Sequence, residues 1–154
     1  MHKIHPQKIE TPFQVAIVTS RFNEDITNAL YDGAISRLLE LGIPNQNITS
    51  AWVPGAIEIP IAAQRFALLD RISVVITLGA VIKGETHHYE YVCEQVNNGC
   101  QRVALDSQKP VVFGVLTTLN KAQALARVGG EHGHYGRYSA DCAYEMVSVL
   151  AQVE

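Results

Sequence analysis

The residues best suited to chemistry are two adjacent histidines, His87 and His88, which follow a glycine-containing turn. The turn, Gly84-Glu85-Thr86, separates a run of buried-strand type from a helical pattern, so Thr86 is expected to cap the helix. A helix start offers unpaired N–H groups and a positive dipole end, and both favour a bound anion such as phosphate. An imidazole titrates near neutral pH and can transfer protons beside that anion. The segment therefore predicts phosphate binding with a histidine proton carrier, although similar junctions occur in every parallel α/β domain.

Metal binding is the alternative reading of the histidines. The His87-His88 pair has no third carboxylate or thiolate ligand at a suitable spacing, and His132 and His134 in a glycine-rich segment are no better placed. We therefore predict no metal site.

The three cysteines form no CxxC pair and are odd in number, which argues against a disulfide framework and favours the reducing cytoplasm. They are Cys93, Cys100 and Cys142.

Composition restricts the class of protein. The 154 residues suffice for one domain. Hydrophobic residues make up 47% of the chain and charged residues 18%, which fits a compact protein with more apolar surface than average and favours an oligomer. The net charge of −3 and the scattered basic residues argue against nucleic-acid binding. The polar N-terminus resembles no signal peptide, and no apolar run is long enough for a membrane span. We expect neither nucleic acid nor membrane as a partner.

Strand-like and helix-like patterns alternate along the chain. After an N-terminal arm (1–12), a single domain (13–154) is predicted to have strands at 13–20, 48–53, 72–78 and 111–117, and helices at 23–41, 56–69, 86–107, 120–128 and 138–153, with a loop at 129–137. Asn23 is expected to cap the first helix. This order predicts an α/β three-layer sandwich around a central four-stranded parallel sheet, with ligands at the carboxyl ends of the strands. The arm is a candidate extra edge strand for a neighbouring subunit.

Four motifs at consistent spacing resemble one enzyme family. They are SRFN (20–23), VPGAIEIP (53–60), GAVIKGETHHYEYV (79–92) and PVVFGVLTT (110–118), the last followed by Arg127. From Phe13 onward the chain resembles the 6,7-dimethyl-8-ribityllumazine synthase family, whose fold is flavodoxin-like. The resemblance implies a transferase of riboflavin biosynthesis that needs no metal or organic cofactor. Its reaction, the penultimate step of the pathway, joins 5-amino-6-(D-ribitylamino)uracil to L-3,4-dihydroxy-2-butanone 4-phosphate.

The same resemblance implies roles for individual residues. His88 would transfer protons, whereas His87 is given no chemical role. Glu85 would bind phosphate through its backbone N–H alone, because a carboxylate would repel the anion. The pyrimidine would contact Phe22, Ala56, Ile57, Glu58, Ala80, Val81, Ile82 and Phe113, and the butanone phosphate would contact Gly84, Glu85, Thr86 and Arg127. From composition alone, Phe22 and Phe113 would be ordinary core aromatics.

One segment departs from the family pattern. Where relatives usually carry Asn-Lys-Gly and an acidic residue three positions after the lysine, this chain has His134-Tyr135-Gly136 and Tyr138, and Glu131 replaces a residue that is often basic. Arg137 or the nearby histidines are expected to restore positive potential. The alternative is a paralogue with altered rate, substrate or assembly.

The resemblance also implies a homopentamer with active sites shared between neighbours. In many relatives twelve pentamers close into a 60-subunit shell, and riboflavin synthase is an implied partner.

Two alternative functions stay open. One is a non-catalytic shell protein that binds flavin or lumazine, and the other is a flavodoxin-like carrier of FMN. A reversible redox couple in a yellow preparation would indicate the carrier, whereas lumazine fluorescence from the two substrates would indicate the enzyme.

Overall fold

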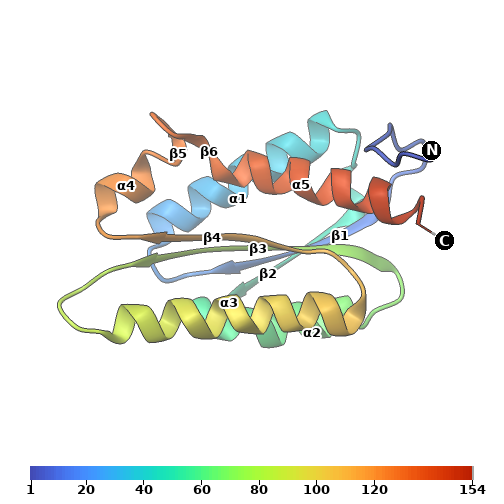
Figure 1. Ribbon diagram of the computed structural model, residues 1–154. Helices are drawn as coiled ribbons and strands as arrows, with labels where there is room; N and C mark the ends of the chain where they lie inside the picture. The colour runs from blue at the N-terminus through green and yellow to red at the C-terminus, as the bar shows by residue number, and fades with distance from the viewer. Residues whose placement is uncertain (154) are drawn as a thin grey trace.

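The computed structural model describes residues 1–153, so Glu154, the last residue of the predicted domain, lies outside the described residues. A parallel sheet of four strands runs in the order β2-β1-β3-β4. The strands are β1 (Gln14–Ser20), β2 (Ile48–Val53), β3 (Ile72–Ile82) and β4 (Val111–Thr118). In Figure 1, α1 (Glu24–Glu40) and α5 (Tyr135–Leu150) cover one face, and α2 (Ile59–Ala67) and α3 (His88–Ser107) cover the other. The predicted α/β three-layer sandwich is confirmed.

Two apolar cores follow from side-chain alternation along β1. Val15 and Ile17 face the layer of α1 and α5, whereas Ala16 and Val18 face the layer of α2 and α3, and all four are fully buried. Successive side chains of a strand point to opposite faces, so a strand buried on both sides must be apolar at every position. Each large aliphatic side chain buried in this way contributes about 1.5–3 kcal/mol to folding.

Strand β3 is longer than its sequence pattern predicts. We expected it to end at Leu78, but pairing with β4 continues to Ile82, which lies opposite Thr118. The partner strand therefore turns Gly79–Ile82 from a predicted turn into extended backbone. The following helix begins at His88 and not at Thr86, whose hydroxyl accepts a hydrogen bond from the His88 N–H (3.3 Å). The predicted 56–69 helix begins as a 3₁₀ turn, η2 (Ala56–Glu58), before α2.

The predicted loop at 129–137 is wrong. It contains a small antiparallel hairpin, β5 (Val128–Gly130) and β6 (Gly133–His134), and α5 begins at Tyr135, three residues before the predicted start. Gly129 and Gly133 adopt positive φ angles of 105° and 76°, which glycine reaches without a steric penalty. The preceding helix, α4 (Lys121–Leu125), is shorter than predicted, and a 3₁₀ turn, η1 (Asn45–Asn47), precedes β2.

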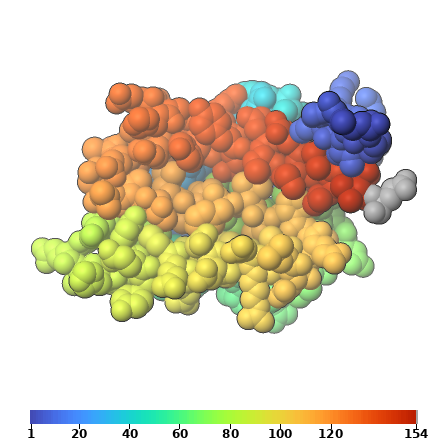
Figure 2. All heavy atoms as spheres, in the orientation of Figure 1, coloured from blue at the N-terminus to red at the C-terminus, as the bar shows by residue number. Residues whose placement is uncertain are grey.

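The N-terminal arm packs against α5 of its own chain. Residues 1–12 contain no helix or strand, but the Gln7 N–H donates to the Ser148 hydroxyl (2.7 Å) and the Ile9 N–H donates to the Tyr144 hydroxyl (2.7 Å). Figures 1 and 2 show this arm against the C-terminal part of α5, so the two termini are close together. Its role as an edge strand for a neighbour stays a prediction. Over the described residues, no helix combines the length and apolar character that crossing a membrane requires.

Candidate active site

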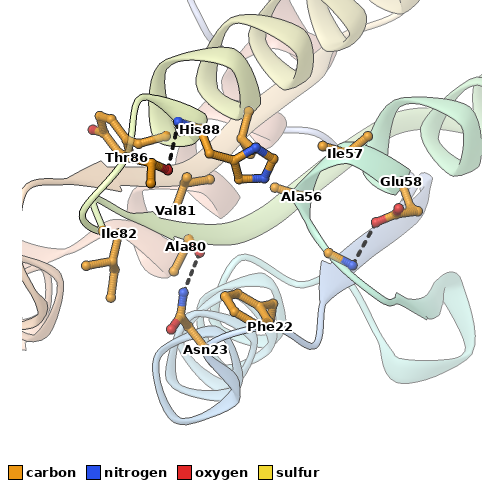
Figure 3. Close-up of a pocket in the computed structure, with 14 residues that line it drawn as sticks. Phe22, Asn23, Ala56, Ile57, Glu58, Ala80, Val81, Ile82, Thr86 and His88 are labelled. Carbon is orange, nitrogen blue, oxygen red and sulfur yellow. Dashed lines mark hydrogen bonds between the residues drawn. The ribbon is translucent and has the colours of Figure 1, made fainter.

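A cavity of about 380 Å³ opens at the carboxyl edge of the sheet. The residues around it come from the ends of β1 and β3, the turn before α2, and the start of α3 (Figure 3). Ten residues predicted from the sequence are brought together here: Phe22, Ala56, Ile57, Glu58, Ala80, Val81, Ile82, Gly84, Thr86 and His88. Asn23, Gly55, Tyr89 and Val92 complete the lining. The predicted residues therefore share one site, while their individual roles stay predictions.

Backbone hydrogen bonds hold Phe22 at the mouth of the cavity. The Arg21 N–H donates to the Val53 carbonyl (2.8 Å), and the Phe22 N–H donates to the Pro54 carbonyl (3.1 Å). These bonds tie the chain after β1 to the chain after β2. The Phe22 ring is 73% exposed, so it is not the core aromatic that composition alone would suggest. A rigidly held, exposed ring is suited to stack on a flat ligand.

Glu58 closes the turn before α2, which also borders the cavity. Its carboxylate accepts a hydrogen bond from the Gly55 N–H (2.9 Å), and the Glu58 N–H donates to the Gly55 carbonyl (3.3 Å). Figure 3 shows this closed turn beside Ala56 and Ile57, with the His88 imidazole reaching toward it from α3. Because a carboxylate has two oxygens and several lone pairs, Glu58 can still accept hydrogen bonds from a ligand.

The turn before α3 carries the candidate phosphate site. Gly84 and Thr86 line the cavity, whereas Glu85 is exposed and does not, which suits a residue expected to act through its backbone alone. Lys83 pairs with Glu90 (3.4 Å) and so bridges the turn. Glu90 has a lowered pKa, because its own backbone N–H and then Lys83 donate hydrogen bonds to the carboxylate. The ion pair thus joins Lys83, before the turn, to Glu90, after it.

Comparison with known proteins decides the family. The sequence model of the 6,7-dimethyl-8-ribityllumazine synthase family matches residues 12–151. Two proteins named 6,7-dimethyl-8-ribityllumazine synthase, from Coxiella burnetii strains CbuG_Q212 and RSA 493 / Nine Mile phase I, are each 50% identical over 145 residues. These residues are 94% of this chain and 96% of each relative. The protein of the same name from strain Dugway 5J108-111 is 48% identical over the same length. The chain belongs to the 6,7-dimethyl-8-ribityllumazine synthase family.

Two site residues expected from the family pattern lie away from the cavity of their own chain. Phe113 pairs with Thr77, three residues before Ala80, and lines a separate depression between β4 and α3. Arg127 lies after the end of α4, and its guanidinium donates to the Gln123 carbonyl (2.8 Å). A single chain therefore does not bring Phe113 or Arg127 to the cavity, because β4 and α4 direct both residues elsewhere.

The segment that departs from the family pattern is built from aromatic rings. Tyr135 and Tyr138 pack edge to face with ring centroids 5.6 Å apart, and both are exposed. Arg137, one candidate for restoring positive potential, instead pairs with Glu40 on α1 (2.7 Å). Arg137 first and Arg37 second lower the Glu40 pKa to about 2. In the single chain Arg137 is therefore engaged with Glu40 on α1, and its expected contribution of positive potential at the site stays a prediction.

His134, one of the two histidines in this segment, is packed against α1. Its ring occupies the space where a side chain on Gly33 would lie, with Cε1 only 2.1 Å from an ideal Cβ position there. The Nδ1 atom is buried and has no hydrogen-bond partner among residues 1–153. Burial, and then the charge of Arg137, lower the His134 pKa. His134 is therefore held in its neutral form and adds little positive potential at pH 7.

Sequence patterns missed several residues that surround the cavity. Tyr89 and Val92 lie one and four positions after His88, so helical spacing could have placed Val92 on the same face of α3. Asn23 is part of the SRFN motif, but we had expected it only to cap α1. Within the described part of the chain, no three His, Cys, Asp or Glu side chains lie close enough to hold a metal ion. The three cysteines are free thiols.

Proposed function

We propose that this chain condenses 5-amino-6-(D-ribitylamino)uracil with L-3,4-dihydroxy-2-butanone 4-phosphate to form 6,7-dimethyl-8-ribityllumazine. The observation that carries the proposal is one cavity that combines an exposed aromatic ring, free backbone edges, a glycine turn at a helix start, and a histidine. Its volume of about 380 Å³ lies in the range of small-molecule sites. The family that the chain belongs to is named for the product of this reaction.

The pyrimidine substrate binds between the strand ends and the η2 turn. Phe22 stacks on the flat ring, because an exposed aromatic face offers contact area and orientation at low entropic cost. Backbone groups of Ala56–Ile57 and Ala80–Ile82 bond to the carbonyl and N–H edges of the pyrimidine. The Glu58 oxygens not used by Gly55 accept hydrogen bonds from the ribityl hydroxyls.

The butanone phosphate binds at the start of α3. Gly84, Glu85 and Thr86 present backbone N–H groups to the phosphate, and the 20-residue helix behind them adds the positive end of its dipole. The pyrimidine amine attacks the ketone to form an imine with loss of water. Phosphate then leaves by β-elimination. After tautomerisation, the nitrogen that carries the ribityl chain attacks the remaining carbonyl and closes the second ring with loss of a second water. Each step moves protons, and His88 serves in turn as base and acid.

A neighbouring subunit supplies the two site residues that the single chain lacks. Phe113 is 40% exposed on the edge strand β4, and Arg127 uses one N–H on Gln123, which leaves further donors for a phosphate. Leu119 and Leu125, which lie between them in the sequence, are 60% and 49% exposed. Apolar side chains beside unused polar groups suit a heterologous contact that closes into a ring, and we propose a homopentamer.

Larger assembly and location extend the proposal. A 60-subunit shell and a riboflavin synthase partner are predictions that follow from the family alone. The resemblance implies contacts between pentamers at the altered segment 129–137, which includes Tyr135 of the exposed tyrosine pair and directly precedes Tyr138. Free thiols at Cys93, Cys100 and Cys142 suit a reducing cytoplasm.

Turnover of purified protein tests the proposed reaction. The two substrates should yield lumazine fluorescence and one phosphate per product, with the same rate before and after treatment with EDTA. Binding of the product without turnover would instead support the non-catalytic shell protein. A yellow preparation with a reversible redox couple would support the carrier of FMN.

Mixed assemblies test the shared site. Chains carrying His88→Ala and chains carrying Arg127→Ala should each have low activity alone, but co-assembled they should recover part of it. Some sites would then combine an intact cavity with an intact Arg127 from the neighbour. Activity equal to the average of the two separate variants would contradict a shared site, as would light scattering that returns a monomer at micromolar concentration.

A further inference from the structure

Asn23 joins two strand ends at the cavity and does not cap the helix that it precedes. Helix α1 has no side-chain cap bond from Asn23. The Asn23 amide nitrogen instead donates to the carbonyl of Ala80, 57 positions along the chain, at 2.8 Å (Figure 3). Asn23 also lines the cavity. The side chain thus connects the end of β1 directly to the part of β3 that borders the site.

The backbone of Asn23 is in a conformation that side chains seldom adopt. Its φ and ψ are 61° and 51°, in the left-handed region, and among the described residues only Gln108 is another non-glycine with positive φ. The Asn23 carbonyl accepts hydrogen bonds from the N–H groups of Ile26 and Thr27 (3.0 Å each). Such conformations persist only where the surroundings enforce them, and they concentrate at functional sites. Asparagine tolerates this region and also carries an amide, whereas glycine tolerates it without one.

The Ala80 carbonyl needs a partner because β3 extends beyond β1. Pairing between these two strands ends at Thr19 and Leu78, whereas pairing of β3 with β4 continues to Ile82. Beyond Leu78, one edge of β3 therefore lacks a neighbouring strand. The Asn23 amide takes the place that a backbone N–H of β1 would occupy. Alternate residues of a parallel strand face opposite neighbours: the Lys83 N–H bonds to the Thr118 carbonyl on β4, so Val81 also faces β4, whereas Ala80 and Ile82 face the free edge. Holding the Ala80 carbonyl therefore fixes the backbone of Ala80 and Ile82 along that edge.

We propose that Asn23 is a positioning residue for the pyrimidine substrate. Its amide holds the end of β3, from Ala80 to Ile82, in the position in which this free edge bonds to the ring. This inference rests on the proposed function, in which Ala80–Ile82 contact the pyrimidine. The proposal predicts different effects on the binding of the two substrates. The phosphate turn at Gly84–Thr86 does not depend on Asn23, because other bonds hold it, including Lys83 with Glu90 and Thr86 with His88.

Two variants of Asn23 remove the amide in different ways. Asn23→Gly keeps the left-handed backbone without strain, which offsets the lost hydrogen bond to Ala80 and the greater freedom of glycine in the unfolded chain, so its thermal midpoint should change little. Asn23→Asp keeps the size and the backbone preference, but its carboxylate cannot donate to the Ala80 carbonyl. Both should raise the KM for the pyrimidine by roughly threefold to tenfold, the size expected for one lost hydrogen bond. The KM for the butanone phosphate should change by less than about twofold in both.

Gln108→Gly is the matched control. Gln108 has the same left-handed backbone (φ 54°) but lies at the end of α3 and is not among the residues around the cavity. It should affect the thermal midpoint as Asn23→Gly does and leave both KM values unchanged. A pyrimidine KM that is unaltered in both Asn23 variants would overturn the proposal. Equal increases for both substrates with a lowered thermal midpoint would overturn it as well, because that result describes a purely structural residue.

Failure of the proposed function would be visible separately. If the unaltered protein makes no lumazine, the reaction is wrong whatever the variants do, and titration with 6,7-dimethyl-8-ribityllumazine then tests Asn23 directly. Weaker binding of that compound by Asn23→Gly, with normal binding by Gln108→Gly, would support positioning. Equal binding by all three proteins would overturn it.

Discussion

The carboxyl edge of the sheet and the hairpin that leads into α5 show two ways of building a site region. At the sheet edge, ten predicted residues surround one cavity, and backbone bonds within the chain hold Phe22 and the turn before α3. At the end of the hairpin, the His134 ring packs over Gly33. In the first turn of α5, Tyr135 and Tyr138 stand at the positions where charges were expected, and Arg137 pairs with Glu40. In the first region the residues of one chain form the cavity, whereas in the second the polar side chains join α5 to α1.

The largest expected effect is on the joint between α5 and α1. A Cβ added at Gly136 would lie 2.1 Å from the carbonyl oxygen of Leu30, which is backbone and cannot rotate away. Gly136→Ala should therefore lower the free energy of unfolding by about 3 kcal/mol, in the upper range for overpacking. Denaturant unfolding measures this change. Gly84→Ala is the control at the sheet edge, since nothing lies within 4 Å of its added Cβ, and a similar loss there would contradict the packing argument.

The next effect concerns proton transfer at the sheet edge. His88→Ala should lower kcat by roughly 10²-fold, at the low end for general acid–base catalysis, because bound water replaces part of the imidazole's role. Steady-state kinetics on both substrates would measure it, with KM values near those of the unaltered protein.

His87→Ala is the control for that measurement. The neighbouring position on a helix points about 100° away, and the His87 side chain is not among those that line the cavity. Near-normal turnover is expected. A sharp loss in the His87 variant together with normal turnover in the His88 variant would reverse the assignment.

A comparable or smaller effect is expected for the cation next to the hairpin. Arg127→Ala removes a charge-assisted hydrogen bond to phosphate and should cost on the order of 1.5–3 kcal/mol in binding of the butanone phosphate. The KM for the pyrimidine should change little, which initial rates with either substrate varied would show. Because Tyr135 stands where relatives usually carry lysine, no second cation from that position compensates. Equal changes in both KM values would point to a structural role for Arg127.

The smallest effect is a pH dependence of stability at His134. Its pKa is lowered in the folded chain from the ordinary value of 6.5, so the folded state binds the proton less tightly than the unfolded state does. Stability from this group is therefore full above about pH 6.5 and decreases as the pH falls below it. The lowered pKa of Glu40, about 2, acts only in more acidic solution.

Unfolding in denaturant at several pH values between 5 and 7.5 measures this dependence. His134→Asn restores the residue that relatives usually have and should flatten the profile in that window. A profile that is equally steep in the variant would assign the dependence to other groups.

Local patterns in the sequence determined the class of fold and most of the site. Continuous apolar runs are required of strands buried on both faces, and all four predicted strands occur as a parallel sheet. Three of the motifs carry ten residues that lie at strand ends or helix starts. These positions are close together at the carboxyl edge of any parallel sheet. Such features depend on neighbours in the chain, which is why the sequence alone predicts them.

Features that depend on a partner segment far along the chain were decided only by the tertiary structure. Strand β3 reaches Ile82 because β4 pairs with it, and the Asn23 amide turns from its helix to Ala80 because β1 stops short of that point. Hydrogen bonding across the hairpin, helped by positive φ at Gly129 and Gly133, makes β5 and β6 from a predicted loop. Arg137 binds Glu40 because α5 crosses α1 there. No periodicity in the sequence indicates these pairings. The partners of β3, Asn23 and Arg137 lie tens of residues away, and the strands of the β5–β6 hairpin, although close in sequence, are too short to show a pattern.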